Sequence, residues 1–141
     1  MGRTWIDSAF WSDTEGLDNA EKIFYLYLLT NEQRNIAGYY KVNLRYMSID
    51  LGMSREEAEA MLSKDQKYWK YDKETQQVLI PKFTRYNIVR SKPQFVKLNA
   101  DLNQLKPCKL HKVFLIAFEE VNGIGAVELI DEKFRRIAAT I

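Results

Sequence analysis

The chain is poor in the residue types on which most catalytic and metal-binding sites depend. Its 141 residues include one cysteine, Cys108, and one histidine, His111. A single cysteine cannot close an intrachain disulfide bond, and structural zinc takes four ligands. We therefore expect no disulfide, no metal site and no cofactor, and the cysteine usage indicates a reducing cytoplasm.

Nucleophilic catalysis has little support in the remaining pattern. Cys108 and His111 lie three residues apart at the start of a predicted helix, where both side chains should point mostly outward. A nucleophile and its base normally need a third group that orients the base in a cleft, so we interpret the spacing as coincidental. The six glycines are scattered and build no phosphate-binding loop. The sequence thus predicts a protein that is not an enzyme.

Long hydrophobic runs are also missing. No apolar run approaches the ~20 residues that a membrane helix needs, and the N-terminal residues MGRTWIDSAFW lack the apolar core of a signal peptide. Hydrophobic residues make up 46% of the chain and charged residues 28%, as in ordinary globular domains. We therefore expect a cytoplasmic protein without a membrane partner.

The charge is unevenly distributed although the net charge is only +2. Residues 1–70 carry nine basic and eleven acidic side chains, whereas residues 71–141 carry twelve and eight. Between Lys82 and Lys112 there are eight Lys and Arg against one acid, Asp101. Such an excess can attract a polyanion, and it can equally be a solvated surface balanced by acids elsewhere in the fold.

Residues 38–83 carry the strongest structural pattern. Gly38 precedes a predicted strand at 39–42, and Asn43 can cap a helix that ends at Gly52, where glycine adopts the left-handed stop without steric cost. Ser54 and Glu57 have capping-box spacing and predict a second helix. Residues 68–72 and 77–83 then flank a polar turn and predict a hairpin. Helix, glycine turn, helix and hairpin is the order of a winged helix-turn-helix.

The segments before and after residues 38–83 are predicted to be mostly helical. A predicted buried helix at 17–30, capped by Asp18 or Asn19, precedes the central stretch. An irregular basic connector at 84–93 follows it, and further helices are predicted at 94–105, 109–121 and 126–141. We therefore predict a mostly α fold with a small β-wing: a winged-helix domain at 1–90 and a helical extension at 91–141. The last helix reaches Ile141 in mid-pattern, so we expect the chain to be the front part of a longer protein.

Two apolar segments are candidates for self-association. Burying the aromatic residues near the N-terminus is favourable by ~25 cal/mol per Å², so they should either close the domain's own core or cover a second subunit. The 3-4-3 spacing in the helix at 94–105 suits a coiled coil and packing on its own domain equally well. The residues predicted for oligomerisation are Trp5, Ile6, Phe10, Trp11, Phe95, Leu98 and Leu102.

Nucleic-acid contact is the functional prediction that the winged helix favours. Arg55 and Gln66 on the second helix could donate to guanine and adenine, while lysines near its end and at the wing suit phosphates. The first turn of that helix is acidic, through Glu56 and Glu57, which disfavours phosphate. The residues predicted to contact DNA are Lys41, Arg45, Arg55, Gln66, Lys67, Lys70, Lys73, Arg85 and Arg90.

In order along the chain, several stretches resemble the front domain of phage replication initiators, the replisome organisers related to the DnaD/DnaB primosome proteins of Gram-positive bacteria. These stretches, within residues 4–121, are WIDSAFWSD, FYLYLLTN, IAGYYKVN, LGMSREEAEAML, WKYDKETQQVLIPKF and LNADLNQLKP. The resemblance implies a winged-helix N-terminal domain that self-associates and can bind origin DNA, without enzymatic activity. It also implies a C-terminal region that contacts single strands or the helicase loader. The recognition helix would be Ser54–Tyr68 and the wing Asp72–Gln77.

The leading hypothesis is therefore a DNA-binding and assembly protein of phage-type replication initiation. Its partners would be double-stranded DNA (origin DNA in the family), further copies of the chain, and the host helicase or its loader through a region beyond Ile141. A winged-helix transcriptional regulator is one alternative, for which footprints should show paired half-sites one turn apart. A winged helix used only for protein–protein assembly is the other.

Overall fold

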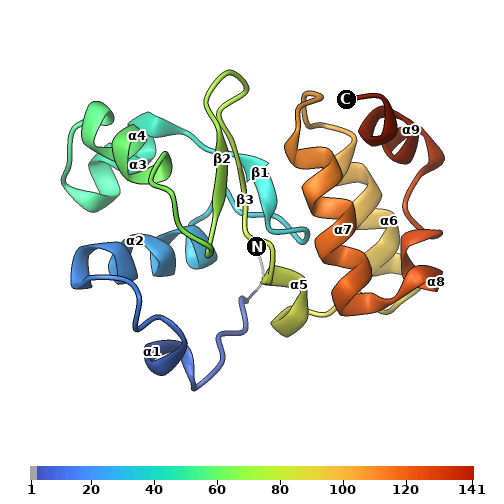
Figure 1. Cartoon of the computed structure of the whole chain (residues 1–141), viewed down its shortest axis with the longest axis horizontal. Coiled ribbons are helices and arrows are strands. Elements are labelled where there is room, and N and C mark those ends of the chain that lie inside the picture. Colours follow the sequence, from blue (N-terminus) through green and yellow to red (C-terminus); the bar gives the residue numbers. More distant parts are fainter. Residues whose placement is uncertain (1–2) are drawn as a thin grey trace.

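A computed structural model describes residues 3–141 (Figure 1). The N-terminal half contains α1 (Phe10–Asp13), α2 (Asn19–Thr30), β1 (Tyr39–Lys41), α3 (Leu44–Leu51), α4 (Arg55–Leu62), β2 (Lys70–Asp72) and β3 (Gln77–Leu79). The remainder contains α5 (Phe83–Tyr86), α6 (Lys92–Leu102), α7 (Leu110–Asn122), α8 (Ile124–Val127) and α9 (Glu132–Thr140). The fold is mostly helical with one small antiparallel sheet, which confirms the predicted class.

The sheet has the strand order β1-β3-β2 and is buried on both faces. Tyr39 pairs with Leu79 on one face, and Tyr40 pairs with Val78 on the other, because neighbouring residues of a strand point to opposite sides. Tyr40 and Val78 join the core beneath α2, α3 and α4, whereas Tyr39 and Leu79 join the core beneath α6, α7 and α9. The two groups of helices lie on opposite sides of the sheet (Figure 1).

The corner between α3 and α4 forms as the sequence predicts. The Asn43 side chain accepts from the Tyr46 amide, and Gly52 ends α3 in the left-handed conformation at φ 64°. The Ser54 hydroxyl accepts from the Glu57 amide while the Glu57 carboxylate accepts from the Ser54 amide, which completes the capping box. With β2 and β3 following as a hairpin, the arrangement is that of a winged helix-turn-helix.

α4 is shorter than predicted. It ends at Leu62, not at Tyr68, and Ser63–Trp69 form an irregular turn that leads into β2. In this turn the buried Trp69 indole donates to the Leu62 carbonyl at 3.1 Å and packs against the Phe24 ring of α2. Burying the Trp69 side chain before β2 stabilises the fold more than a longer α4 would, because aromatic side chains bury a large apolar area.

The C-terminal helices differ from their predicted bounds for local reasons. α6 begins at Lys92, capped by Ser91, because Pro93 lies in the first turn where its missing amide is harmless. Part of the predicted irregular connector is the short helix α5. The predicted helix at 126–141 is broken in two: Ile130 is buried, and the Asp131 amide donates to the Asn99 side chain at 2.9 Å.

The helical extension shares its core with the sheet. Phe95, Leu98 and Leu102 lie in the cluster that also contains Tyr39 and Leu79, with exposures of 8%, 0% and 1%. Their assignment to oligomerisation is therefore wrong, and their seam packs on the chain's own domain. Within residues 3–141, no helix has both the length and the apolar character needed to cross a membrane.

Candidate nucleic-acid interface

The strand register divides the predicted DNA-contacting residues between two ends of the sheet. Lys41 is aligned with Gln77 and Asp72 at the end where the hairpin turns, and Lys73 continues into that turn. Lys70 is aligned with Leu79 at the other end, where the chain continues into α5. In Figure 1 the hairpin tip and α5 lie at opposite ends of the strands. The nine residues therefore fall into two groups, one at each end of the sheet.

We call four exposed residues the wing surface: Lys41 and Lys73 at the hairpin end of the sheet, Arg45 on α3 and Arg55 on α4. The Tyr71 hydroxyl donates to Glu59 Oε2 at 2.9 Å, which fixes β2 against α4. Lys73 Nζ lies 3.7 Å from the other oxygen of Glu59. Arg55 is one turn before Glu59 and therefore shares its side of α4. The hairpin thus stands directly beside the exposed side of the second helix.

The wing surface is not strongly positive. Glu56 and Glu57 occupy the first turn of α4, and Glu59 is paired with Lys73. Hydrogen bonds from the Ser54 amide and hydroxyl lower the pKa of Glu57, so it remains a carboxylate. Negative charge is favoured at this helix end by the peptide dipoles, and it repels phosphate in the same place. Any duplex held here would be held weakly.

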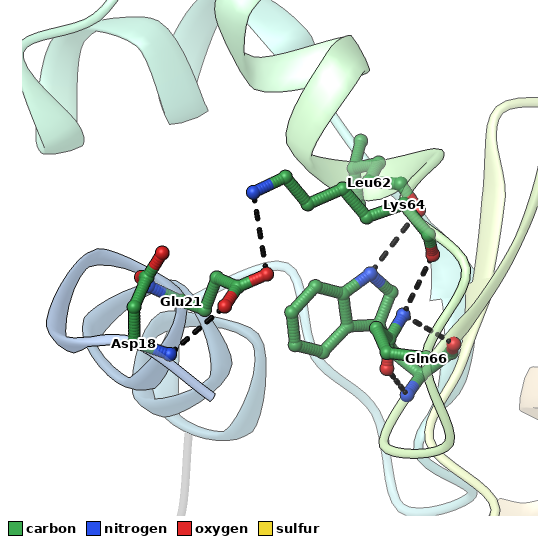
Figure 2. Close-up of polar contacts among 6 residues, drawn as sticks. Asp18, Glu21, Leu62, Lys64 and Gln66 are labelled. Carbon is green, nitrogen blue, oxygen red and sulfur yellow. Dashed lines mark hydrogen bonds and ion pairs between the residues drawn. The ribbon is translucent and has the colours of Figure 1, made fainter. Parts of the chain in front are cut away.

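Gln66 is not available to read a base. Its Oε1 accepts from the amides of Tyr68 at 2.7 Å and Trp69 at 2.9 Å, and its Nε2 donates to the carbonyls of Lys64 and Trp69. Figure 2 shows the side chain turned into its own loop. The prediction of adenine contact is therefore wrong, because the loop's backbone groups take every polar atom of this amide. The spacing of residues did not indicate these hydrogen bonds, because the predicted helix extended past Gln66 and placed its side chain on the surface.

Lys64, a basic residue in the same turn, is tied to α2. Its Nζ lies 3.2 Å from Glu21 Oε2, while the second oxygen of Glu21 accepts from the Asp18 amide as part of the α2 capping box (Figure 2). The ion pair joins α2 to the end of α4, and it removes one further positive charge from the surface available to phosphate.

The second group of predicted residues lies at the α5 end. Lys67 and Arg85 line one cavity of about 320 Å³ together with Lys82, and Arg90 lines an adjoining cleft of about 700 Å³. Arg85 and Arg90 therefore do not extend the wing surface, which corrects the prediction. Lys70 belongs to this end as well, and its Nζ donates to the Gln66 carbonyl at 3.2 Å.

The adjoining cleft, which we call the basic cleft, brings together residues that are far apart in the sequence. Its charged lining is Arg3, Arg34, Arg90 and Lys97, and none of its described lining residues is acidic. Of these, only Arg90 is among the residues predicted to contact DNA. Counting Lys and Arg along the sequence detects only charges that are close in the chain. Arg3 lies in the N-terminal segment and Arg34 in the loop before β1, so this count did not group them with Arg90.

Cys108 and His111 are buried, contrary to the outward orientation predicted for them. His111 Nδ1 lies 2.6 Å from the Tyr39 hydroxyl, and Cys108 Sγ lies 3.1 Å from the same oxygen. His111 also stacks on Phe134. Burial lowers the pKa of His111 to about 4, so the ring is neutral at pH 7. Through these contacts the cluster joins the sheet to α7 and α9.

Metal binding has no geometric support in residues 3–141, where no group of three or more His, Cys, Asp or Glu side chains is placed to hold an ion.

Comparisons with known proteins add no assignment. No family model, no curated protein and no solved structure matches the chain.

Proposed function

We propose that the protein is a non-enzymatic DNA-binding and assembly protein, acting at a replication origin as the resemblance to phage replisome organisers implies. The observation that supports the proposal is the α3–Gly52–α4 corner with the β2–β3 hairpin standing beside the exposed side of α4. In winged helices this combination places the second helix in the major groove and the hairpin against the backbone.

On this proposal most contacts are made to phosphate. Arg55 is the one predicted base-reading side chain that remains exposed on α4, since Gln66 is held within its loop. Lys41, Arg45 and Lys73 flank it with positive charges that can position a duplex without reading its sequence. Weak sequence preference is the expected consequence, with assembly of several copies supplying the affinity that one domain lacks.

Self-association through the N-terminal segment belongs to the same proposal. Trp5, Ile6 and Trp11 are 71%, 39% and 60% exposed, while Phe10 is buried in the domain's own core. The exposed members therefore remain candidates for contact between copies. Contact with a helicase or its loader belongs to the same proposal and is supported by the resemblance alone.

The experiment is a duplex titration by fluorescence anisotropy at two salt concentrations, with the protein's mass in solution measured alongside. If about five phosphates are contacted, the logarithm of the affinity falls with the logarithm of salt at a slope near −4 to −5. Arg55→Ala should weaken binding, whereas Lys133→Ala, which removes an exposed charge from α9 on the other side of the sheet, should not. Equal losses in both variants would contradict a wing-surface contact.

A second candidate is a winged helix used only for assembly. Tyr46 and Ile49 on α3 are 50% and 68% exposed, an apolar surface beside an acidic helix turn that favours protein over phosphate. Under this reading the protein forms oligomers yet binds no duplex at low salt, and Ile49→Ala lowers its mass in solution.

A further inference from the structure

The basic cleft combines recessed positive charge with an exposed aromatic ring. Trp5 lines it and is 71% exposed, which is unusual for so large an apolar side chain. Tyr86 lines the same cleft and lies beneath the Arg85 guanidinium at 5.8 Å. The cleft therefore offers two exposed aromatic rings, those of Trp5 and Tyr86, beside its cationic side chains.

The backbone of Trp5 is held against the domain. The Trp5 amide donates to Asn87 Oδ1 at 2.7 Å, and Asn87 Nδ2 donates back to the Trp5 carbonyl at 3.1 Å. These two hydrogen bonds span 82 residues of sequence and hold the backbone of the N-terminal segment against the end of α5. Arg34 adds a bond to the Thr4 hydroxyl. The backbone is fixed at this point while the indole stays in solvent.

The charges in the cleft are suited to phosphate. Within residues 3–141, the guanidinium groups of Arg3 and Arg90 take part in no ion pair, and both line the cleft. Lys97 is paired with Asp101 at 2.8 Å, so its charge is largely compensated. Guanidinium groups bind phosphate oxygens in a bidentate fashion and also stack on planar rings.

A second cavity continues past the indole. It shares Trp5, Phe83, Tyr86 and Asn87 with the basic cleft, so these four residues form the boundary between the two. Lys67, Lys82 and Arg85 line it, against the acids Asp7 and Asp13. A flexible chain of alternating phosphates and rings could therefore lie across the indole with cations on either side.

We propose that the basic cleft binds an unpaired nucleotide of a nucleic-acid strand, with its base stacked on the Trp5 indole and its phosphate held by Arg3 and Arg90. A duplex does not fit this chemistry, because its bases are stacked on one another and present no free ring surface. An unpaired base does, and aromatic stacking contributes without regard to base identity. The site lies at the α5 end of the sheet and is independent of the wing surface.

The test is a titration of the full chain with a single-stranded deoxythymidine decamer, followed by tryptophan fluorescence. Trp5→Ala should weaken binding about 5- to 150-fold and remove most of the fluorescence quenching. Trp11→Ala controls for assembly: that indole is 60% exposed, lines neither cavity and, like Trp5, is a candidate for contact between copies, so it reports any loss of affinity that comes from assembly alone. Arg90→Ala, which lies outside the N-terminal segment, should weaken binding and leave the fold intact. Masses in solution are compared so that a change of assembly is recognised.

Competitors identify the ligand. Thymidine monophosphate and inorganic phosphate should compete far less well than the decamer; equal competition by the monophosphate would make the ligand a free nucleotide and overturn the strand proposal. Equal weakening in the Trp5 and Trp11 variants would overturn the site. Arg55→Ala should leave decamer binding unchanged. If Trp5→Ala leaves decamer binding unchanged while Arg55→Ala weakens duplex binding, this site fails and the proposed function stands. If Arg55→Ala leaves duplex binding unchanged while Trp5→Ala weakens decamer binding, the proposed function fails and this site stands.

Discussion

Two glycines with the same backbone conformation differ in what surrounds them. Gly38 and Gly52 have φ of 66° and 64°, in the left-handed region that favours glycine. A Cβ at Gly52 would meet nothing within 4 Å, whereas a Cβ at Gly38 would lie 2.2 Å from the Cβ of Phe83. Gly52 serves only as a helix stop, while Gly38 also lets the chain before β1 pass closely under the start of α5.

We therefore expect Gly52→Ala and Gly38→Ala to differ sharply. Both pay the left-handed penalty of roughly 1–2 kcal/mol, and the second must also displace the buried Phe83 from the core. Urea unfolding should give a modest loss of stability for Gly52→Ala and a loss at least twice as large for Gly38→Ala. Equal losses would show that Phe83 moves aside without cost.

At single positions, the role of a side chain could be predicted where its partners are a few residues away. It was mispredicted where a residue distant in the sequence determines its surroundings. Asn43, Gly52, Ser54 and Asp18 act as predicted, since each satisfies backbone groups within a few residues. Gln66 has the spacing of a helical surface residue, yet it serves the turn around Trp69. That outcome depends on the Trp69 ring finding Phe24, a contact between segments that no local pattern contains.

Among the elements, α7 is attached to the sheet by a buried polar contact. His111 donates to or accepts from the Tyr39 hydroxyl at 2.6 Å and is 1% exposed. Burial raises the pKa of Tyr39 above its ordinary value, so the hydroxyl keeps its proton. The groups that face the imidazole are this hydroxyl and the Phe134 ring of α9, with the Cys108 thiol on the same oxygen. None of them is an anion that would favour the charged imidazolium.

Acid should therefore loosen this attachment. The folded pKa of His111 is about 4 against a reference of 6.5, so the unfolded chain binds the proton first. Stability from the neutral ring is complete above pH 6.5 and falls by roughly 3 kcal/mol as the pH drops towards 4. His111→Gln keeps a polar partner for Tyr39 and does not titrate. Unfolding at a series of pH values should show a smaller decline in the variant; parallel curves would contradict the assignment.

Element boundaries were predictable where a cap or a glycine marks them and less so elsewhere. α2, α3 and the start of α4 follow their capping residues. The end of α4 and the break before α9 have no such marker, because each is set by the burial of one side chain, Trp69 or Ile130, against another part of the fold. The candidate site follows the same division: the wing could be placed from sequence, while the basic cleft needed the N-terminal segment to be folded against α5.

For the whole molecule, the central point is that one three-stranded sheet serves two cores. The two predicted domains, at residues 1–90 and 91–141, meet in a connector that is polar and basic. In the structure β3 presents Val78 to one core and Leu79 to the other, and both side chains are fully buried. The alternation of two adjacent apolar residues in such a short strand is too brief for a sequence pattern to reveal.

This arrangement predicts that the two cores unfold together. Leu98→Ala creates a cavity in the core between α6 and the sheet and should cost about 2–5 kcal/mol. The loss should appear equally in the far-ultraviolet signal of the helices and in the fluorescence of Trp69, which lies in the other core. Trp5→Phe and Trp11→Phe in the background leave Trp69 as the reporter. Val96→Ala, two residues away on the exposed side of α6, is the control and should change neither signal. The two signals should fall together because a strand cannot lose the packing on one face and keep its full stability on the other. If Trp69 kept its midpoint of unfolding while the helical signal fell earlier, the two halves would be independent domains.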